Sequence, residues 1–145
     1  RTTQLFLMDL HPKNIVDKMF KNDAFSQWLG IVRIEDGAGI SVLKMSVRKE
    51  MLNGFAILHG GISYSLADSA LAFAANGHGV KSVSVETSIS HTAPCKEGDV
   101  LTARTEEMSL SHKIGVYHIT ITNQEHKTVA LFKGTVYRTG KQWEF

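Results

Sequence analysis

The chain of 145 residues has little of several features that mark specialised classes of protein. Its single cysteine, Cys95, excludes an internal disulfide and favours a reducing compartment, so we expect a cytoplasmic protein. No apolar run is long enough to span a bilayer, and we expect no membrane partner. The net charge is only +2, too small and too scattered to indicate nucleic-acid binding.

The seven histidines also lack a pattern typical of metal ligands, such as His-Glu-x-x-His. We therefore expect no metal site and no organic cofactor. Cys95 follows Pro94 in a predicted turn with no evident base nearby, which indicates an ordinary thiol and not a nucleophile.

The composition that remains is typical of one ordered domain. Apolar residues make up 43% of the chain and charged residues 21%, with two prolines and no repeat or linker. We therefore expect a single domain over residues 1–145. Residues 1–7 are a candidate vector-derived segment, because Met8 could be the native start and the apolar run 5–8 is too short for a signal peptide.

The first third of the chain changes from a helical to a strand-like period. After Pro12, apolar residues at helical spacing predict a helix to about Asn22. From Trp28 the pattern becomes strand-like, and the Gly-rich turn 36–39 predicts a hairpin. Residues 49–58 break the pattern and are expected to form a loop.

The rest of the chain reads as one helix followed by four strands. Residues from about Gly60 to Ala75 are rich in alanine and apolar nearly all round, which is typical of a buried helix. Strands joined by short turns form antiparallel sheets. We therefore predict an α+β fold with a curved antiparallel sheet wrapped around a long central helix, and a short N-terminal helix. The four strands are expected at 82–91, 100–108, 114–122 and 129–138.

The most informative stretch runs from Asn53 to Asp68, where a loop turns into the central helix. Gly60 and Gly61 lie at the helix start, which presents unpaired N–H groups and the positive end of the helix dipole. Glycine lets a ligand approach this backbone closely. Asp68 then places a carboxylate two turns into an otherwise apolar helix. Hydrogen-bond donors and a carboxylate together are suited to attack on a carbonyl group.

This stretch resembles the signature of hotdog-fold acyl-CoA thioesterases, and most of all the phenylacetate-degradation (PaaI-type) family. The likeness lies in His59-Gly60-Gly61 with an acid eight residues after the first glycine. The stretches 115–124 and 127–134 also look like that family, so the resemblance covers about residues 25–138. It implies a hotdog fold, thioester hydrolysis, and homodimers that pair into a homotetramer.

The resemblance also implies roles for single residues. The Gly60 N–H would polarise the thioester carbonyl, and Asp68 would act as general base or nucleophile. His59 and Asn53 would help to place the thioester or the water. Ser84 lies where some relatives have a serine that positions water.

Each of these residues also has an alternative interpretation. Asp68 could be a paired core carboxylate, His59 and Asn53 could only shape the loop, and Ser84 could be an ordinary strand residue. Gly60 and Gly61 could merely allow close helix packing. For binding the substrate, and in particular the coenzyme A phosphates, the candidates are Gly61, Lys81 and the polar turn Ser111, His112 and Lys113. A turn of this composition is more often simply solvated.

Helix geometry adds a constraint of its own. Eight helical residues rise about 12 Å and turn through two turns plus about 80°. Gly60 and Asp68 of one chain therefore cannot touch the same carbonyl, whereas two antiparallel helices across a two-fold axis can bring them together. We predict two shared sites per dimer and no activity in a monomer.

The function predicted from the sequence is hydrolysis of an acyl-CoA, aryl-acetyl or medium-chain, to free acid and coenzyme A. Two alternatives stay open. A hotdog dehydratase or hydratase usually places its catalytic histidine differently. A non-catalytic acyl-CoA-binding module would more typically lack the acid, and a ligand sensor of that kind would carry a DNA-binding segment.

Overall fold

The computed structural model describes residues 10–145, so the candidate vector-derived segment lies outside the described residues. Two short helices precede a hairpin, a long helix and four further strands. In chain order the elements are α2 (Pro12–Lys21), α3 (Ala24–Trp28), β1 (Val32–Gly37), β2 (Ile40–Ser46), the 3-10 turn η1 (Lys49–Met51), α4 (Gly60–Asn76), β3 (Val80–His91), β4 (Val100–Leu110), β5 (Ile114–Thr122) and β6 (Thr128–Gln142).

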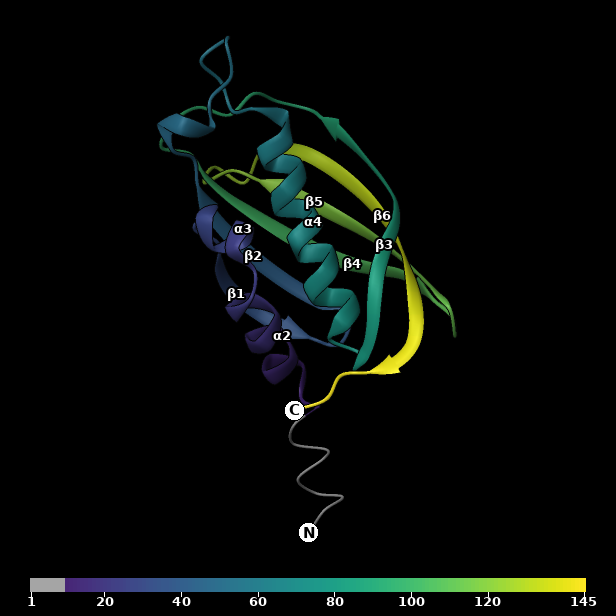
Figure 1. The fold of residues 1–145 in the computed structure, drawn as a ribbon. Coiled ribbons are helices and arrows are strands. Elements are labelled where there is room, and N and C mark those ends of the chain that lie inside the picture. Colours follow the sequence, from purple (N-terminus) through teal and green to yellow (C-terminus); the bar gives the residue numbers. More distant parts are fainter. Residues whose placement is uncertain (1–9) are drawn as a thin grey trace.

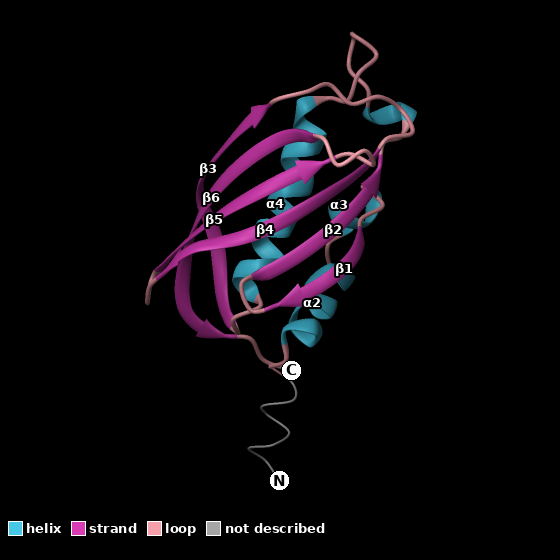
Figure 2. Ribbon diagram, turned by 180° about the vertical axis from the view of Figure 1, so that it is seen from behind, coloured by secondary structure: helices cyan, strands magenta, loops and turns pink. Residues whose placement is uncertain are grey.

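The six strands form one antiparallel sheet in the order β1-β2-β4-β5-β6-β3. The sheet curves around α4, which lies along its inner face (Figure 1). Seen from behind, the strands cover the helix, and α2 and α3 lie beside β1 and β2 (Figure 2). The predicted α+β architecture of a sheet wrapped around a central helix is confirmed.

Helix α4 is buried as its composition predicts, with ten of its seventeen residues buried. Small alanine side chains let the helix approach the sheet closely. The approach is close at Gly134 in β6, where a Cβ would lie 2.5 Å from a methyl carbon of Leu71. A methyl group there would therefore force the buried Leu71 side chain or the strand to shift.

The short helix α3 is the main element that the sequence pattern does not predict. A segment of five residues is too short to show a helical period. The strand-like pattern is expected to begin at Trp28, but this residue ends the helix instead. Asp23 caps α3, accepting hydrogen bonds from the Ser26 backbone N–H at 2.9 Å and the Ser26 hydroxyl at 2.6 Å. Ser26 also contacts Ser69 of α4, with 2.8 Å between the hydroxyl oxygens. The cap thus ties α3 to the central helix.

Strand β3 lies at one edge of the sheet. It pairs with β6 on one side, and within residues 10–145 no strand pairs with its other side. Its residues Val83 and Val85 are 56% and 60% exposed. An uncovered strand edge with apolar side chains is a template for pairing with another chain. No helix in the described part of the chain combines the length and the apolar character that a membrane span needs.

Candidate active site

The start of α4 leaves one strong hydrogen-bond donor free. His59 is the N-cap residue, and its Nδ1 atom accepts a hydrogen bond from the Gly61 N–H at 2.9 Å. Such a cap satisfies one of the N–H groups that a helix start leaves unpaired. The Gly60 N–H donates to no residue in 10–145. It therefore remains available, at the positive end of the helix dipole, to an oxygen atom from outside.

The imidazole of His91, at the end of β3, lies against Gly60. A Cβ on Gly60 would lie 2.9 Å from the Nε2 atom of His91, so a side chain there would require the imidazole or the helix start to shift. The Nδ1 atom of His91 is 3.3 Å from the Ser63 hydroxyl, which also donates to the Gly60 carbonyl at 3.1 Å. Sequence reasoning missed His91 and Ser63, because only the packing of β3 against α4 brings them to the glycine.

The loop before α4 is shaped by Asn53. Its Oδ1 atom accepts hydrogen bonds from the backbone N–H groups of Phe55 at 2.9 Å and Ile57 at 3.4 Å. Asn53 thus makes the loop-shaping contacts of its alternative interpretation. It also lines a cavity of about 400 Å³ together with Gly60 and His91.

The buried Cys95 lines the same cavity. Burial, with the nearby Asp99 carboxylate, raises the pKa of its thiol to about 11. A thiol with so high a pKa stays protonated at neutral pH and is a poor nucleophile. The interpretation of Cys95 as an ordinary thiol agrees with this environment.

The carboxylate of Asp68 lies in a second cavity, of about 440 Å³, which Ser84 and Lys81 also line. Asp68 is half-buried and accepts no hydrogen bond from residues 10–145. Burial raises its pKa above the usual range for aspartate, and the charge of Asp23 raises it further. A carboxylate with a raised pKa in a cavity is a stronger base than one in water, which suits proton abstraction.

The structure therefore divides the predicted site residues between two cavities. Gly60 and Asn53 line one, and Asp68, Ser84 and Lys81 line the other. The division follows from helix geometry, since Gly60 and Asp68 are eight residues apart on α4. Gly60 and Asp68 of one chain thus line separate cavities.

The remaining candidates for substrate binding lie elsewhere. The turn 111–113 is exposed and lines neither cavity, and its Ser111 carbonyl accepts a hydrogen bond from Arg138 at 2.8 Å. The ammonium of Lys81 lies 5.3 Å from the ring centroid of Trp143, a cation–π arrangement. Gly61 is exposed beside its N-cap histidine.

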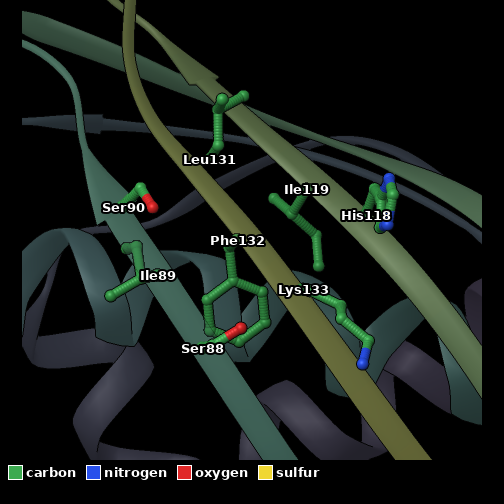
Figure 3. A pocket seen from close by; sticks show the side chains of 8 residues that line it. All are labelled: Ser88, Ile89, Ser90, His118, Ile119, Leu131, Phe132 and Lys133. Carbon is green, nitrogen blue, oxygen red and sulfur yellow. The ribbon is translucent and has the colours of Figure 1, made fainter.

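A third cavity, of about 310 Å³, crosses β3, β6 and β5 (Figure 3). It includes His118 and Lys133, which are exposed, but no predicted site residue and no carboxylate. It therefore lacks the pair of groups that attack on a carbonyl needs. Among residues 10–145, no three His, Cys, Asp or Glu side chains come together as a possible metal site.

Comparison with known proteins identifies the family of this chain. Residues 55–130 match the model of the Thioesterase superfamily. The acyl-coenzyme A thioesterase PaaI of Escherichia coli K12 is 43% identical over 122 residues, which cover 84% of this chain and 87% of PaaI. The matched segment includes both Gly60 and Asp68.

Solved structures give the same answer for the fold. The E. coli PaaI protein, from the phenylacetic acid degradation operon, superposes with a TM-score of 0.88 at 40% identity, covering 90% of this chain and 95% of that one. A protein of Thermus thermophilus gives 0.78 at 35% identity, with 81% and 98% covered. A thioesterase-like protein of Streptococcus pneumoniae TIGR4, solved with coenzyme A, gives 0.81 at 28% identity, with 87% and 98% covered. The chain belongs to the thioesterase superfamily and has the hotdog fold that its sequence predicts.

Proposed function

We propose that this chain hydrolyses an acyl-CoA thioester to a free acid and coenzyme A. The observation that carries the proposal is that one chain has both a Gly60 N–H without a partner in residues 10–145, at a helix start, and a half-buried carboxylate at Asp68. Relatives support it, since PaaI of E. coli is named as an acyl-CoA thioesterase and the S. pneumoniae protein was solved with coenzyme A.

In the proposed reaction the thioester oxygen accepts a hydrogen bond from the Gly60 N–H. As negative charge develops on this oxygen, the N–H and the helix dipole stabilise it. A single donor of this kind is worth roughly 10²–10³ in rate. The absence of a side chain on Gly60 leaves the oxygen a direct approach.

Asp68 supplies the basic group. In one route it takes a proton from water, the hydroxide adds to the carbonyl carbon, the C–S bond breaks, and the proton passes to the leaving thiolate. In the other route the carboxylate adds to the carbonyl carbon itself and expels the thiolate, and water then hydrolyses the anhydride. In this proposal Ser84, which lines the same cavity, holds the water in either route.

The proposed site is shared between two chains that pair through β3. Ser84 and Asp68 lie in the cavity beside the start of β3, whereas His91 and Gly60 lie in the cavity at its end. When two copies of the free β3 edge pair about a two-fold axis, the start of one strand meets the end of the other. This arrangement brings Asp68 of one subunit toward Gly60 of its partner, twice per dimer.

The other predicted residues take supporting roles in this proposal. His59 fixes the helix start through its bond to the Gly61 N–H, and Asn53 fixes the loop that leads into it. The turn 111–113 carries charge and polar groups that suit the coenzyme A phosphates, whereas the ammonium of Lys81 lies over Trp143 in the cavity of Asp68. We also propose that the dimers pair into a tetramer, as the resemblance implies.

Mixing two strongly impaired variants tests both the chemistry and the shared geometry. In a co-expressed 1:1 mixture of Asp68→Asn and Gly60→Ala chains, each site draws Gly60 from one chain and Asp68 from another. Random pairing then regenerates about a quarter of the wild-type sites. We expect about that fraction of wild-type thiol release from phenylacetyl-CoA and octanoyl-CoA.

Two results would overturn parts of the proposal. If each variant is inactive alone and the mixture is also inactive although co-purification shows mixed assemblies, the site is not shared. If the wild-type protein binds acyl-CoA by calorimetry but releases no thiol from any aryl or fatty acyl-CoA, the chain is a binding module and not a hydrolase.

A further inference from the structure

The cavity beside Asp68 follows one face of the second half of α4. Asp68, Ala72 and Asn76 are spaced by four residues, so they lie in one row along the helix, and all three line the cavity. From Asp68 to Asn76 this row extends about 12 Å. The opposite wall comes from the first residues of β3 and from Val136 of β6.

Trp143 stands where this row ends. It comes from the segment after β6, and it lines the same cavity. Its indole Nε1–H donates to the Oδ1 atom of Asn76 at 3.0 Å, and its backbone N–H donates to the Gly79 carbonyl at 3.0 Å. The indole is therefore fixed at the far end from Asp68.

The donors and acceptors of the Asn76 side-chain amide are all hydrogen-bonded. Its Oδ1 atom also accepts the Ser82 N–H at 2.9 Å, and its Nδ2 group donates to the Ala72 and Ser82 carbonyls at 2.8 and 3.1 Å. The side chain is buried. A buried amide with every bond satisfied does not rotate cheaply, so the anchor of Trp143 is rigid.

We infer that Trp143, held by Asn76, is the end wall of the acyl subsite and sets the longest acyl group that the site accepts. The inference rests on the proposed function, because Asp68 marks where the thioester carbon lies. Met19 of α2 and Leu71 of α4 supply further apolar lining along the way. The subsite is thus a mostly apolar slot with the carboxylate of Asp68 toward one end and the indole of Trp143, which Lys81 covers, at the other.

The length of the slot fixes the substrate class. An extended chain gains roughly 1.2 Å per bond, from about 3.3–3.6 Å per three backbone bonds. A slot of about 12 Å therefore holds roughly ten bonds before it meets the indole. Unbranched acyl groups of up to about ten carbons fit this slot, and longer chains are excluded.

A chain-length series on Trp143→Ala tests the wall. Hydrolysis of phenylacetyl-CoA and of saturated acyl-CoA esters from four to sixteen carbons is compared in wild type and variant. We expect kcat/KM for the fourteen- and sixteen-carbon esters to rise by about tenfold or more, and KM for phenylacetyl-CoA to rise. Trp143→Phe keeps an aromatic wall and should keep the wild-type cutoff. Trp28→Ala removes the other tryptophan, which is outside the cavity and stacks on Phe25, and should also leave the cutoff unchanged.

A folded Trp143→Ala enzyme with the wild-type chain-length profile would overturn the inference. If that variant does not fold, binding gives a second test. In Trp28→Phe/Asp68→Asn, Trp143 is the only tryptophan. Its fluorescence should shift when decanoyl-CoA binds and not when coenzyme A alone binds. Binding of decanoyl-CoA seen by calorimetry with no shift would place the acyl group elsewhere. Failure of the proposed function can be told apart from failure of this inference, because the wild-type enzyme would then hydrolyse no ester of the series.

Discussion

Replacing Gly60 by alanine probes the contact between the start of α4 and the end of β3. The new Cβ would lie 2.9 Å from His91 Nε2 and 3.3 Å from His91 Cε1, so the imidazole or the helix start must shift by several tenths of an ångström. The backbone of Gly60 does not have a positive φ, so alanine fits it without strain and by itself would stabilise by about 0.4–1 kcal/mol. Overpacking costs about 1–3 kcal/mol, so the net loss of stability is roughly 0–2.5 kcal/mol.

The effect on activity should be larger than the effect on stability. A misplacement of about 1 Å can cost about 10²-fold in rate, and the Gly60 N–H is the proposed oxyanion donor. We therefore expect Gly60→Ala to lower kcat/KM for phenylacetyl-CoA by about 100-fold, with urea unfolding changed only modestly. Gly54→Ala is the matched control, because a Cβ there meets no atom within 4 Å.

The double variant Gly60→Ala/His91→Ala shows whether the collision is the cause. Removing the imidazole makes room for the methyl group, so the double variant should recover at least tenfold over Gly60→Ala, a coupling of about 1.4 kcal/mol or more. If the two losses simply multiply, the methyl group acts by blocking the substrate and the contact with His91 does not matter.

Further predictions concern the carboxylate and the packing of α4. Asp68→Asn should lower kcat by roughly 10²–10⁴ with little change in KM, which steady-state kinetics will check. Because the pKa of Asp68 is raised, kcat should fall with acid at a pH above the usual aspartate range, and Asp23→Asn should move this limb to lower pH. The folded chain then binds a proton at Asp68 more tightly than the unfolded chain, so stability decreases as pH rises from the unfolded to the folded pKa, and Asp68→Asn should remove this decrease in urea titrations. Gly134→Ala should destabilise by about 1–3 kcal/mol, because its Cβ would lie 2.5 Å from Leu71, and an unchanged midpoint would refute the packing argument.

The longer elements, in which the apolar pattern repeats over many residues, could be predicted from the sequence. The alanine-rich helix and the four late strands come within a few residues of the observed bounds, and β5 matches its predicted range of 114–122. Helix α3 is not predicted, because five residues are too few to show a period. The extension of β6 to Gln142, four residues past Arg138, is not predicted either, because polar residues there give no strand-like alternation.

The candidate site was predictable only where its residues are close in sequence. Gly60 and Asp68 share one helix, so their separation followed from helix geometry alone. His91 and Trp143 reach the two cavities through long-range packing, which leaves no local signal. Lys81 is a sequence-based candidate for coenzyme A, and its position over Trp143 is a tertiary fact that no spacing indicates.

The strand order has a consequence for how the chain matures during synthesis. Within residues 10–145 the single partner of β3 is β6, and paired residues such as Ser82 and Arg138 are far apart in the sequence. On the ribosome, where the N-terminal part emerges first, β3 must wait as an unpaired segment until β6 has emerged. The free edge proposed to bind a second chain, and the tryptophan that closes the slot, are therefore completed only after β6 has been made. In the proposed shared site, the first catalytic turnover then requires β6 to have paired with β3 in both chains.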